Sequence, residues 1–199
     1  MKIYGSYTSP FVRRIRYLCL ELNIPFELID TMIESGQTEL RTKSPIWKVP
    51  CIEVDGIIIW DSHVIMEYLF EKNGAGNFRI PNQEEKWMEY NRVNAIDGGL
   101  ESAINVFYLN RDGVKTDTSA YMQKQLGRLV SALEWIKPQL VDNYFTKNQK
   151  LGLSELALYT ALDWMRFRKM YAVDEDKILS EFLKFHSNNP YLVKTEIPG

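Results

Sequence analysis

The sequence GSYTSPFVRR, residues 5–14, follows a short apolar run and marks a change of structure at the start of the chain. The run before it, KIY, is typical of a β-strand. Pro10 is typical of the first residue of an α-helix, because the N–H that proline lacks would have no partner there. Ser9 is then expected as the N-cap, with its hydroxyl oxygen accepting a hydrogen bond from the first turn. The stretch therefore predicts a strand that passes directly into a helix.

The start of this helix is also suited to hold an anion, because free N–H groups and the positive end of the helix dipole converge beside Ser9. A thiol with a pKa near 8.5 is only about 3% ionised at pH 7, and lowering that pKa by roughly two units requires about 2.7 kcal/mol. A hydrogen bond from a hydroxyl to a charged group contributes about 1.5 to 3 kcal/mol, and a helix end up to about 2. Two roles for Ser9 follow: a helix cap alone, or a cap that also stabilises a thiolate.

Alternating strand and helix patterns continue over about the first seventy residues. The dipeptide Asp55-Gly56 between two apolar runs is a strong signal for a tight hairpin. We predict, in order, a strand at 2–6, a helix at 10–22, a strand at 25–30, a helix at 36–43, strands at 51–54 and 57–60, and a helix at 62–73. The predicted order is βαβαββα.

From Glu84 onward only helical patterns remain. The candidate helices are residues 87–110, 118–143, 153–168 and 174–186. Pro138 falls inside the second of these and is expected to kink or shorten it. The polar segment between the two halves is typical of a domain boundary. We therefore expect an α/β domain over residues 1–75, followed by an all-helical domain over residues 84–199.

The composition is that of a packed globular protein without a strong charge bias. Of the 199 residues 45% are apolar and 13% are aromatic, and the formal net charge is -2. This balance argues against general attraction to nucleic acid or to acidic membranes. The run of Arg13, Arg14 and Arg16 is expected to form a solvated helix face, with the alternative that Arg13 lies near a bound thiolate.

Neither a leader peptide nor a metal site is expected. The N-terminus has no apolar segment after its single lysine, so a soluble cytoplasmic protein is expected. Cys19 and Cys51 form neither a redox pair nor a disulfide framework, and we expect both to be buried structural thiols. His63 and His186 are not spaced as metal ligands, so no metal is expected.

Two further segments carry residue types that suit a ligand. In SPIWKVPCIEV, residues 44–54, a cis bond at Pro50 would leave the backbone of Val49 free to pair with an extended peptide, whereas a trans proline would only guard a strand edge. In WDSHVIMEYL, residues 60–69, Ser62 is expected as an N-cap with Asp61 beside it. The free N–H groups at this helix N-terminus suit a carboxylate, and the aspartate beside them can hold an ammonium group, although an ordinary capped helix has the same sequence.

These segments occur together in the order and spacing of one family. With TSPFVRR at 8–14, KVP at 48–50 and DS at 61–62, the chain resembles the cytosolic glutathione transferase superfamily over essentially its full length. The stretch GLSELAL, residues 152–158, resembles the family's capped sixth helix. The resemblance implies a thioredoxin-like domain followed by a helical domain, glutathione as co-substrate, and a homodimer.

The same resemblance implies a role for each matching residue. Ser9 would orient or activate the glutathione sulfur. Val49 would pair through its backbone at the edge that Pro50 creates. Asp61 and Ser62 would bind the γ-glutamyl end of glutathione.

The glycine end of glutathione is matched less closely. Lys48, or a residue near Gln37, would meet the glycine carboxylate. Trp47 stands where a small residue often precedes the lysine, and its bulk could crowd this end. In the sixth helix Gly152 replaces the usual serine or threonine cap and Glu155 the usual aspartate, so the capping box is half made.

Other residues are candidates for the chemistry. Tyr7 or Tyr4 is an alternative hydroxyl donor, as tyrosine is in other classes of the superfamily, but the Ser-Pro helix start favours Ser9. In the family the helix face that carries Tyr108 and Arg111 lines the site for a small apolar electrophile, which makes these two residues candidates for that site together with Tyr7.

The resemblance implies a glutathione transferase that acts in detoxification. A GST-fold binding or regulatory protein of the stringent-starvation type, without catalytic activity, is one alternative. Glutathione-dependent peroxide reduction or isomerisation is another. Because Ser9 and Val12 stand where a glutaredoxin has its two cysteines, a thiol–disulfide cycle on the protein itself is not expected.

Overall fold

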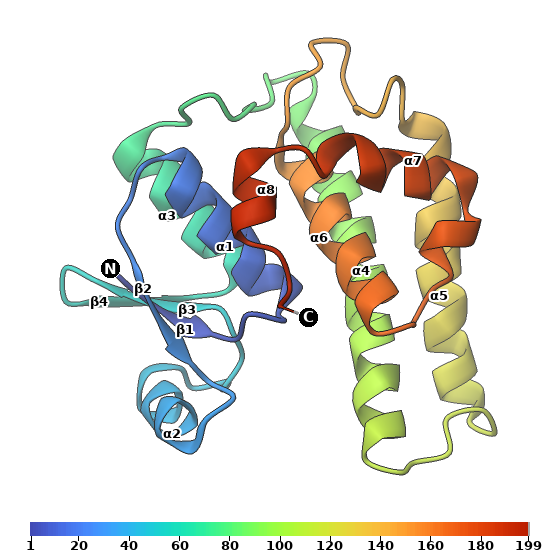
Figure 1. The fold of residues 1–199 in the computed structure, drawn as a ribbon, viewed down its shortest axis with the longest axis horizontal. Coiled ribbons are helices and arrows are strands. Elements are labelled where there is room, and N and C mark those ends of the chain that lie inside the picture. Colours follow the sequence, from blue (N-terminus) through green and yellow to red (C-terminus); the bar gives the residue numbers. More distant parts are fainter. Residues whose placement is uncertain (199) are drawn as a thin grey trace. The chain divides into compact units, whose positions relative to one another are not determined.

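The structure is a computed structural model that describes residues 1–198. The chain divides into two compact units (Figure 1). The first unit contains Met1–Phe78 together with the segment from Ser187 onward, and the second is Arg79–His186. The segment that ends the chain is thus part of the unit that begins it.

The first unit is built on a four-stranded sheet (Figure 1). Its elements are β1 (Lys2–Gly5), α1 (Pro10–Glu21), β2 (Glu27–Asp30), α2 (Glu34–Lys43), β3 (Cys51–Val54), β4 (Ile57–Trp60), α3 (Ser62–Asn73) and, from the end of the chain, α8 (Pro190–Lys194). The strand order is β2-β1-β3-β4, with β1 parallel to β2 and antiparallel to β3, and β3 antiparallel to β4. The predicted order βαβαββα is confirmed, and the unit is thioredoxin-like.

Strand alternation gives this sheet two apolar faces. Ile3 and Ile52 point to one face, where they are fully buried. Tyr4 and Cys51, each one residue away, point to the other face and pack with Leu40 of α2. Because both faces are apolar, α1 and α3 cover one of them and α2 covers the other (Figure 1).

The arginine run of α1 is buried, so the expectation of a solvated helix face is wrong. Arg13, Arg14 and Arg16 are at most 6% exposed. The Nη2 of Arg13 donates to the carbonyl oxygen of Leu192 at 3.0 Å, and the Nη1 of Arg16 donates to that of Thr195 at 3.2 Å. Guanidinium groups thus bind carbonyl oxygens at the C-terminal end of α8, a helix that sequence patterns did not predict.

The second unit is helical, as predicted. It contains α4 (Lys86–Arg111), α5 (Ala120–Ile136), α6 (Leu153–Phe167) and α7 (Lys177–His186), with short 3-10 helices η1 (Lys137–Gln139) and η2 (Val173–Glu175). The expected shortening at Pro138 is confirmed, since α5 ends at Ile136 and the proline lies in η1. Within residues 1–198, no helix combines the length and the apolar character needed to cross a bilayer.

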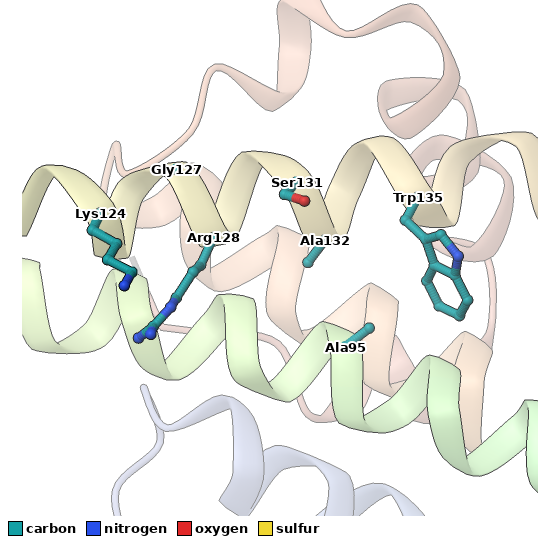
Figure 2. Close-up of a pocket in the computed structure, with 7 residues that line it drawn as sticks. All are labelled: Ala95, Lys124, Gly127, Arg128, Ser131, Ala132 and Trp135. Carbon is teal, nitrogen blue, oxygen red and sulfur yellow. The ribbon is translucent and has the colours of Figure 1, made fainter.

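An open groove with a volume of about 580 Å³ lies between α4 and α5 (Figure 2). It is lined by Ala95 of α4 and by Lys124, Gly127, Arg128, Ser131, Ala132 and Trp135 of α5. Four of these seven residues are glycine, alanine or serine, and Trp135 is 42% exposed. Small side chains leave the two helix backbones close to the surface along this groove.

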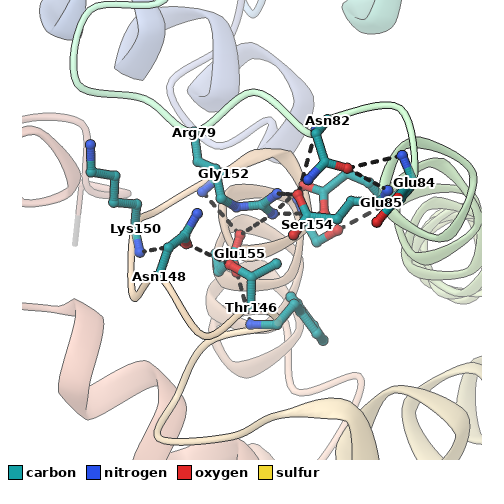
Figure 3. A network of polar contacts seen from close by, with 12 residues as sticks. Arg79, Asn82, Glu84, Glu85, Thr146, Asn148, Lys150, Gly152, Ser154 and Glu155 are labelled. Carbon is teal, nitrogen blue, oxygen red and sulfur yellow. Dashed lines mark hydrogen bonds and ion pairs between the residues drawn. The ribbon is translucent and has the colours of Figure 1, made fainter.

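A buried ion-pair network holds the start of α6 (Figure 3). The Nη2 of Arg79 lies 2.7 Å from both carboxylate oxygens of Glu89 and 3.3 Å from Oε2 of Glu155. The backbone N–H of Ser154 donates to Glu89 at 3.0 Å, and that of Gly152 donates to Glu155 at 2.9 Å. Two N–H groups that the first turn of a helix leaves without partners are thereby satisfied.

Gly152 is required by this network. A Cβ at residue 152 would lie only 2.7 Å from Nη2 of Arg79. The guanidinium is held in place by two fully buried carboxylates, so it cannot move aside without breaking an ion pair. Burial raises the pKa of Glu155, and the charge of Arg79 acts in the opposite direction. The half-made capping box is therefore a consequence of the arginine that occupies the space of the missing cap side chain.

Replacement of Gly152 by serine tests this explanation. Capping preference alone predicts no loss, since serine is at least as good an N-cap as glycine. We expect Gly152→Ser to lower the free energy of unfolding by about 2 to 4 kcal/mol, because the new side chain displaces a buried guanidinium. Ser119→Gly, which changes the N-cap of α5, is the control and is expected to lower the free energy of unfolding by only about a few tenths of a kcal/mol. Denaturant unfolding measures both, and a Gly152→Ser variant as stable as the wild type contradicts the explanation.

Candidate functional site

The register of the sheet brings the three predicted site segments to one end. Cys51 at the start of β3 lies opposite Tyr4 of β1 on one side and opposite Trp60 of β4 on the other. Pro50, one residue earlier, is therefore flanked by the last residue of β1 and by Asp61. The loop after β1, the bend before β3 and the helix start after β4 therefore lie at the same end of the sheet. Sequence spacing alone does not give this arrangement.

Ser9 is the N-cap of α1, as predicted. Its backbone is extended, and its Oγ accepts a hydrogen bond from the N–H of Val12 at 3.3 Å. Gly5 allows this turn to approach the sheet, since a Cβ there would lie 2.4 Å from Cγ2 of Val12. Ser9 is half-buried, and within residues 1–198 its hydroxyl hydrogen has no acceptor. The hydroxyl can therefore donate to an anion while its oxygen still caps the helix.

The bend before β3 has the geometry that an extended ligand would use. The peptide bond between Val49 and Pro50 is cis, the alternative that the family resemblance implies. Val49 is half-buried, and among the described residues its N–H and C=O form no backbone hydrogen bond. Pairing between this edge and a ligand backbone would use these two groups. The side chain of Lys48, directly before them, is exposed.

The helix start after β4 differs from the prediction by one residue. Asp61, not Ser62, is the N-cap of α3: its Oδ1 accepts a hydrogen bond from the N–H of His63 at 2.8 Å. The backbone of Asp61 has φ 74° and ψ 129°, a conformation that residues other than glycine rarely adopt. Ser62 is the first helical residue and is buried, and within residues 1–198 its hydroxyl has no hydrogen-bond partner. Sequence reasoning gave the right pair but exchanged their roles.

The two alternative tyrosines have different surroundings. The hydroxyl of Tyr4 lies 2.7 Å from Glu39 and 2.8 Å from Glu53, and burial together with these carboxylates raises its pKa. The Tyr4 hydroxyl thus forms its hydrogen bonds on the face of the sheet that α2 covers, and it is not available to donate to a thiolate. Tyr7 is 44% exposed, and the Arg16 guanidinium lies 4.8 Å from the centre of its ring. Of the two tyrosines, only Tyr7 remains an alternative to Ser9.

The residues that the resemblance places near the glycine end of glutathione are exposed. Trp47 is 62% exposed, with the Arg41 guanidinium of α2 lying 5.2 Å from the centre of its ring. Gln37 of α2 is also exposed. The indole therefore packs along the surface of α2.

The two cysteines are buried structural thiols, as expected. Both have no exposed surface. Burial raises the pKa of Cys19 to about 12 and that of Cys51 to about 11, so neither is a thiolate at neutral pH. Among the described residues, no group of three or more histidine, cysteine, aspartate or glutamate side chains is arranged to hold a metal.

The electrophile candidates of the second unit lie at the end of α4. Tyr108 is 46% exposed, and the Arg111 guanidinium lies 4.6 Å from the centre of its ring. Phe107, beside it, also contacts Arg168, a residue that sequence reasoning did not consider. Its sequence signal, a cation directly after the last residue of a helix, indicates only a favourable interaction with the helix dipole.

The chain is similar in sequence to known proteins. Residues 3–77 match the family model described as glutathione S-transferase, N-terminal domain. The uncharacterised GST-like protein YibF of Escherichia coli K12 is 26% identical over 100% of this chain and 99% of its own length. A glutathione S-transferase from Hyoscyamus muticus is 21% identical over 89% of this chain and 88% of its own.

Solved structures share the fold. A glutathione S-transferase from Methylobacterium radiotolerans, in complex with glutathione sulfonate, has a TM-score of 0.85 at 18% identity and covers 99% of this chain and 94% of its own. One from Methylobacillus flagellatus, with GSH bound, has a TM-score of 0.84 at 21% identity and covers 99% of both chains. A sheet unit followed by a helical unit is therefore common to this chain and both structures.

The positive φ of Asp61 leads to a testable prediction about the stability of the protein. Glycine relieves the strain of a positive φ, about 1 to 3 kcal/mol, but loses the cap, whereas alanine loses the cap and keeps the strain. We expect Asp61→Gly to be as stable as the wild type or more so, and Asp61→Ala to be less stable by about 1 kcal/mol. Thermal and denaturant unfolding compare the two. Equal losses in both variants would show that the backbone of Asp61 is not strained.

Proposed function

Because the chain belongs to the cytosolic glutathione S-transferase superfamily, we propose that it is a glutathione transferase, which binds glutathione as co-substrate and activates its thiol for attack on small electrophiles. One observation carries the proposal: the register sets a hydroxyl at a helix start, a cis-proline edge and a capped helix start at one end of the sheet. Each feature alone has an ordinary structural explanation. Their meeting at one end is what a tripeptide with a thiol in its middle requires.

Glutathione would lie extended along this end of the sheet. The N–H and C=O of Val49 would pair with the backbone of its central cysteine. The α-carboxylate of the γ-glutamyl group would accept hydrogen bonds from Ser62 and the N-terminus of α3, and its ammonium would bind Asp61. Lys48, or a residue near Gln37, would meet the glycine carboxylate.

Thiolate activation would come from Ser9 and the helix that it caps. The hydroxyl donates to the sulfur, and the N-terminus of α1 adds its positive field. The thiolate then forms a carbon–sulfur bond to the electrophile, the leaving group departs with its electron pair, and the thiol proton passes to solvent. Holding both reactants together supplies a large share of the remaining acceleration. Tyr7, Tyr108 and Arg111 are proposed to line the electrophile site.

Replacement of Ser9 by alanine tests the assignment. We expect Ser9→Ala to lower kcat/KM for glutathione and a generic aryl halide roughly tenfold to a hundredfold at neutral pH. The pKa of bound glutathione, read from thiolate absorbance, rises by about one to two units. Ser9→Thr keeps the hydroxyl and is expected to retain most activity. Unchanged activity in Ser9→Ala together with a loss in Tyr7→Phe transfers the role to Tyr7.

A matched control separates catalysis from stability. Ser119 caps α5 through a hydrogen bond of 3.4 Å from Met122, much as Ser9 caps α1, but belongs to the other unit. Ser119→Ala is expected to cost about 1 kcal/mol of stability and leave activity unchanged. Retention of the wild type on immobilised glutathione without any turnover would indicate a glutathione-binding protein that is not a transferase. Absence of retention would contradict glutathione binding itself.

We also propose that the protein is a homodimer in which the groove between α4 and α5 belongs to the subunit interface. The family resemblance implies a dimer, and this groove exposes apolar surface and small residues that let a second chain approach closely.

Sedimentation velocity at micromolar concentration tests the dimer. Ser131→Arg adds a long charged side chain in the groove and is expected to shift the wild-type dimer to monomers. Val130→Arg is the matched control, because Val130 is next to Ser131 and exposed on α5 but does not line the groove. A monomeric wild type, or equal dissociation of both variants, contradicts this assignment.

A further inference from the structure

The C-terminal ends of α4 and α6 carry an aromatic cluster. The two helices pack together within the second unit and run in the same direction (Figure 1). Phe107 of α4 and Trp164 of α6 join them, with ring centres 5.7 Å apart in an edge-to-face arrangement. Tyr108 contacts Phe107 in a similar way at 5.4 Å. Phe167 at the end of α6 is 41% exposed, so the cluster reaches the protein surface.

Arg168 is held between the rings of this cluster. Its guanidinium carbon lies 5.0 Å from the ring centre of Phe107 and 4.5 Å from that of Phe167. Its Nε is buried and has no hydrogen-bond partner, and among the described residues no carboxylate forms an ion pair with it. The side chain as a whole is half-buried. A positive charge partly removed from water thus has aromatic faces beside it but no anion.

Neighbouring arginines do not share this property. Arg166, two residues earlier on the same helix, is paired with Asp163 at 2.7 Å. Arg111 is paired with Asp112 at 3.1 Å, and both side chains are more than half exposed. A cation at a helix C-terminus needs no aromatic rings for its effect, and Arg166 already supplies one for α6. The helix dipole therefore does not explain why Arg168 is fixed between two phenyl rings.

We propose that Arg168 is a specificity-determining residue that selects aromatic electrophiles carrying a carboxylate or sulfonate group. The inference rests on the proposed transferase function and names the substrate class of its electrophile site, which that proposal assigns to the adjoining end of α4. The fork of guanidinium donors binds a planar carboxylate with two hydrogen bonds. The exposed rings of Tyr108 and Phe167 offer stacking surface to the aromatic body of the same substrate.

The aromatic surroundings strengthen this recognition. Cation–π contacts fix the plane of the guanidinium, so little side-chain entropy is lost when an anion binds. Partial burial lowers the effective dielectric constant, which increases the attraction of an anion over that of an exposed arginine. Arg111 contributes less, because Asp112 already occupies one side of its guanidinium.

A pair of matched electrophiles tests the proposal. A chloronitrobenzoate and its primary amide undergo the same reaction: the glutathione sulfur bonds to the ring carbon, and chloride leaves with its electron pair. They have nearly the same shape, and only the first carries a negative charge. We expect the wild type to have a kcat/KM about tenfold higher for the carboxylate, after correction for the uncatalysed rates. In Arg168→Gln this preference is lost, whereas the rate with the amide is retained.

Arg166→Gln is the control for removal of one positive charge at the same helix end, and it is expected to keep the preference for the carboxylate. Arg168→Lys retains the charge but not the fork, and an intermediate preference is expected. If wild type and Arg168→Gln discriminate equally between the two electrophiles, or if Arg166→Gln loses the preference as well, the proposal is wrong.

A binding measurement keeps this test independent of turnover. The aromatic sulfonate anilinonaphthalene sulfonate reports binding by its fluorescence, so wild type, Arg168→Gln and Arg166→Gln can be compared without a reaction. We expect the dissociation constant for the dye to be about tenfold larger in Arg168→Gln than in the wild type. In Arg166→Gln it is expected to be unchanged. Absence of reaction with both electrophiles overturns the transferase proposal, whereas equal binding of the dye by all three proteins overturns the anion subsite.

Discussion

The pairing of β3 with both β1 and β4 is the constraint on which the site depends. A strand bonded on both sides has a fixed register, because a slip by one residue would turn Ile52 out of one core and Cys51 out of the other. This register sets Pro50 between the end of β1 and the end of β4. The cap of α1 and the cap of α3 follow directly from those strand ends. A requirement of core packing thereby determines which polar groups lie together.

The same logic governs the second unit. Arg79 lies fully inside the protein only because Glu89 and Glu155 face it, and these carboxylates also bind the backbone N–H groups at the start of α6. A glycine at residue 152 is the condition for that arrangement. Removing water from a guanidinium is unfavourable unless it is paired, so one side chain explains several otherwise separate features of this helix start.

Much of the fold was predictable because local signals agree with the tertiary structure. Ser9-Pro10, Asp55-Gly56 and Pro138 act through their own backbones, and each has its expected effect. Errors arose where partners are distant in sequence. The arginines of α1 have the spacing of a solvated face, yet they are buried, and Arg13 and Arg16 donate to carbonyl oxygens of Leu192 and Thr195 from a distant part of the chain. The exchange of roles between Asp61 and Ser62 was a smaller error of one position at a helix end.

The sequence by itself determined the main elements other than α8, their order, the residues of the candidate site and the family resemblance, because periodicity and capping are properties of neighbouring residues. Only the tertiary structure decided that the Tyr4 hydroxyl contacts two glutamates and that Gly152 makes room for Arg79. It also decided that Arg168 lies between two aromatic rings, with no carboxylate of residues 1–198 paired to it. Apart from the contact of Arg168 with its neighbour Phe167, these contacts join residues far apart along the chain. Their energies depend on burial and on which charges are brought close, and neither is encoded in local spacing.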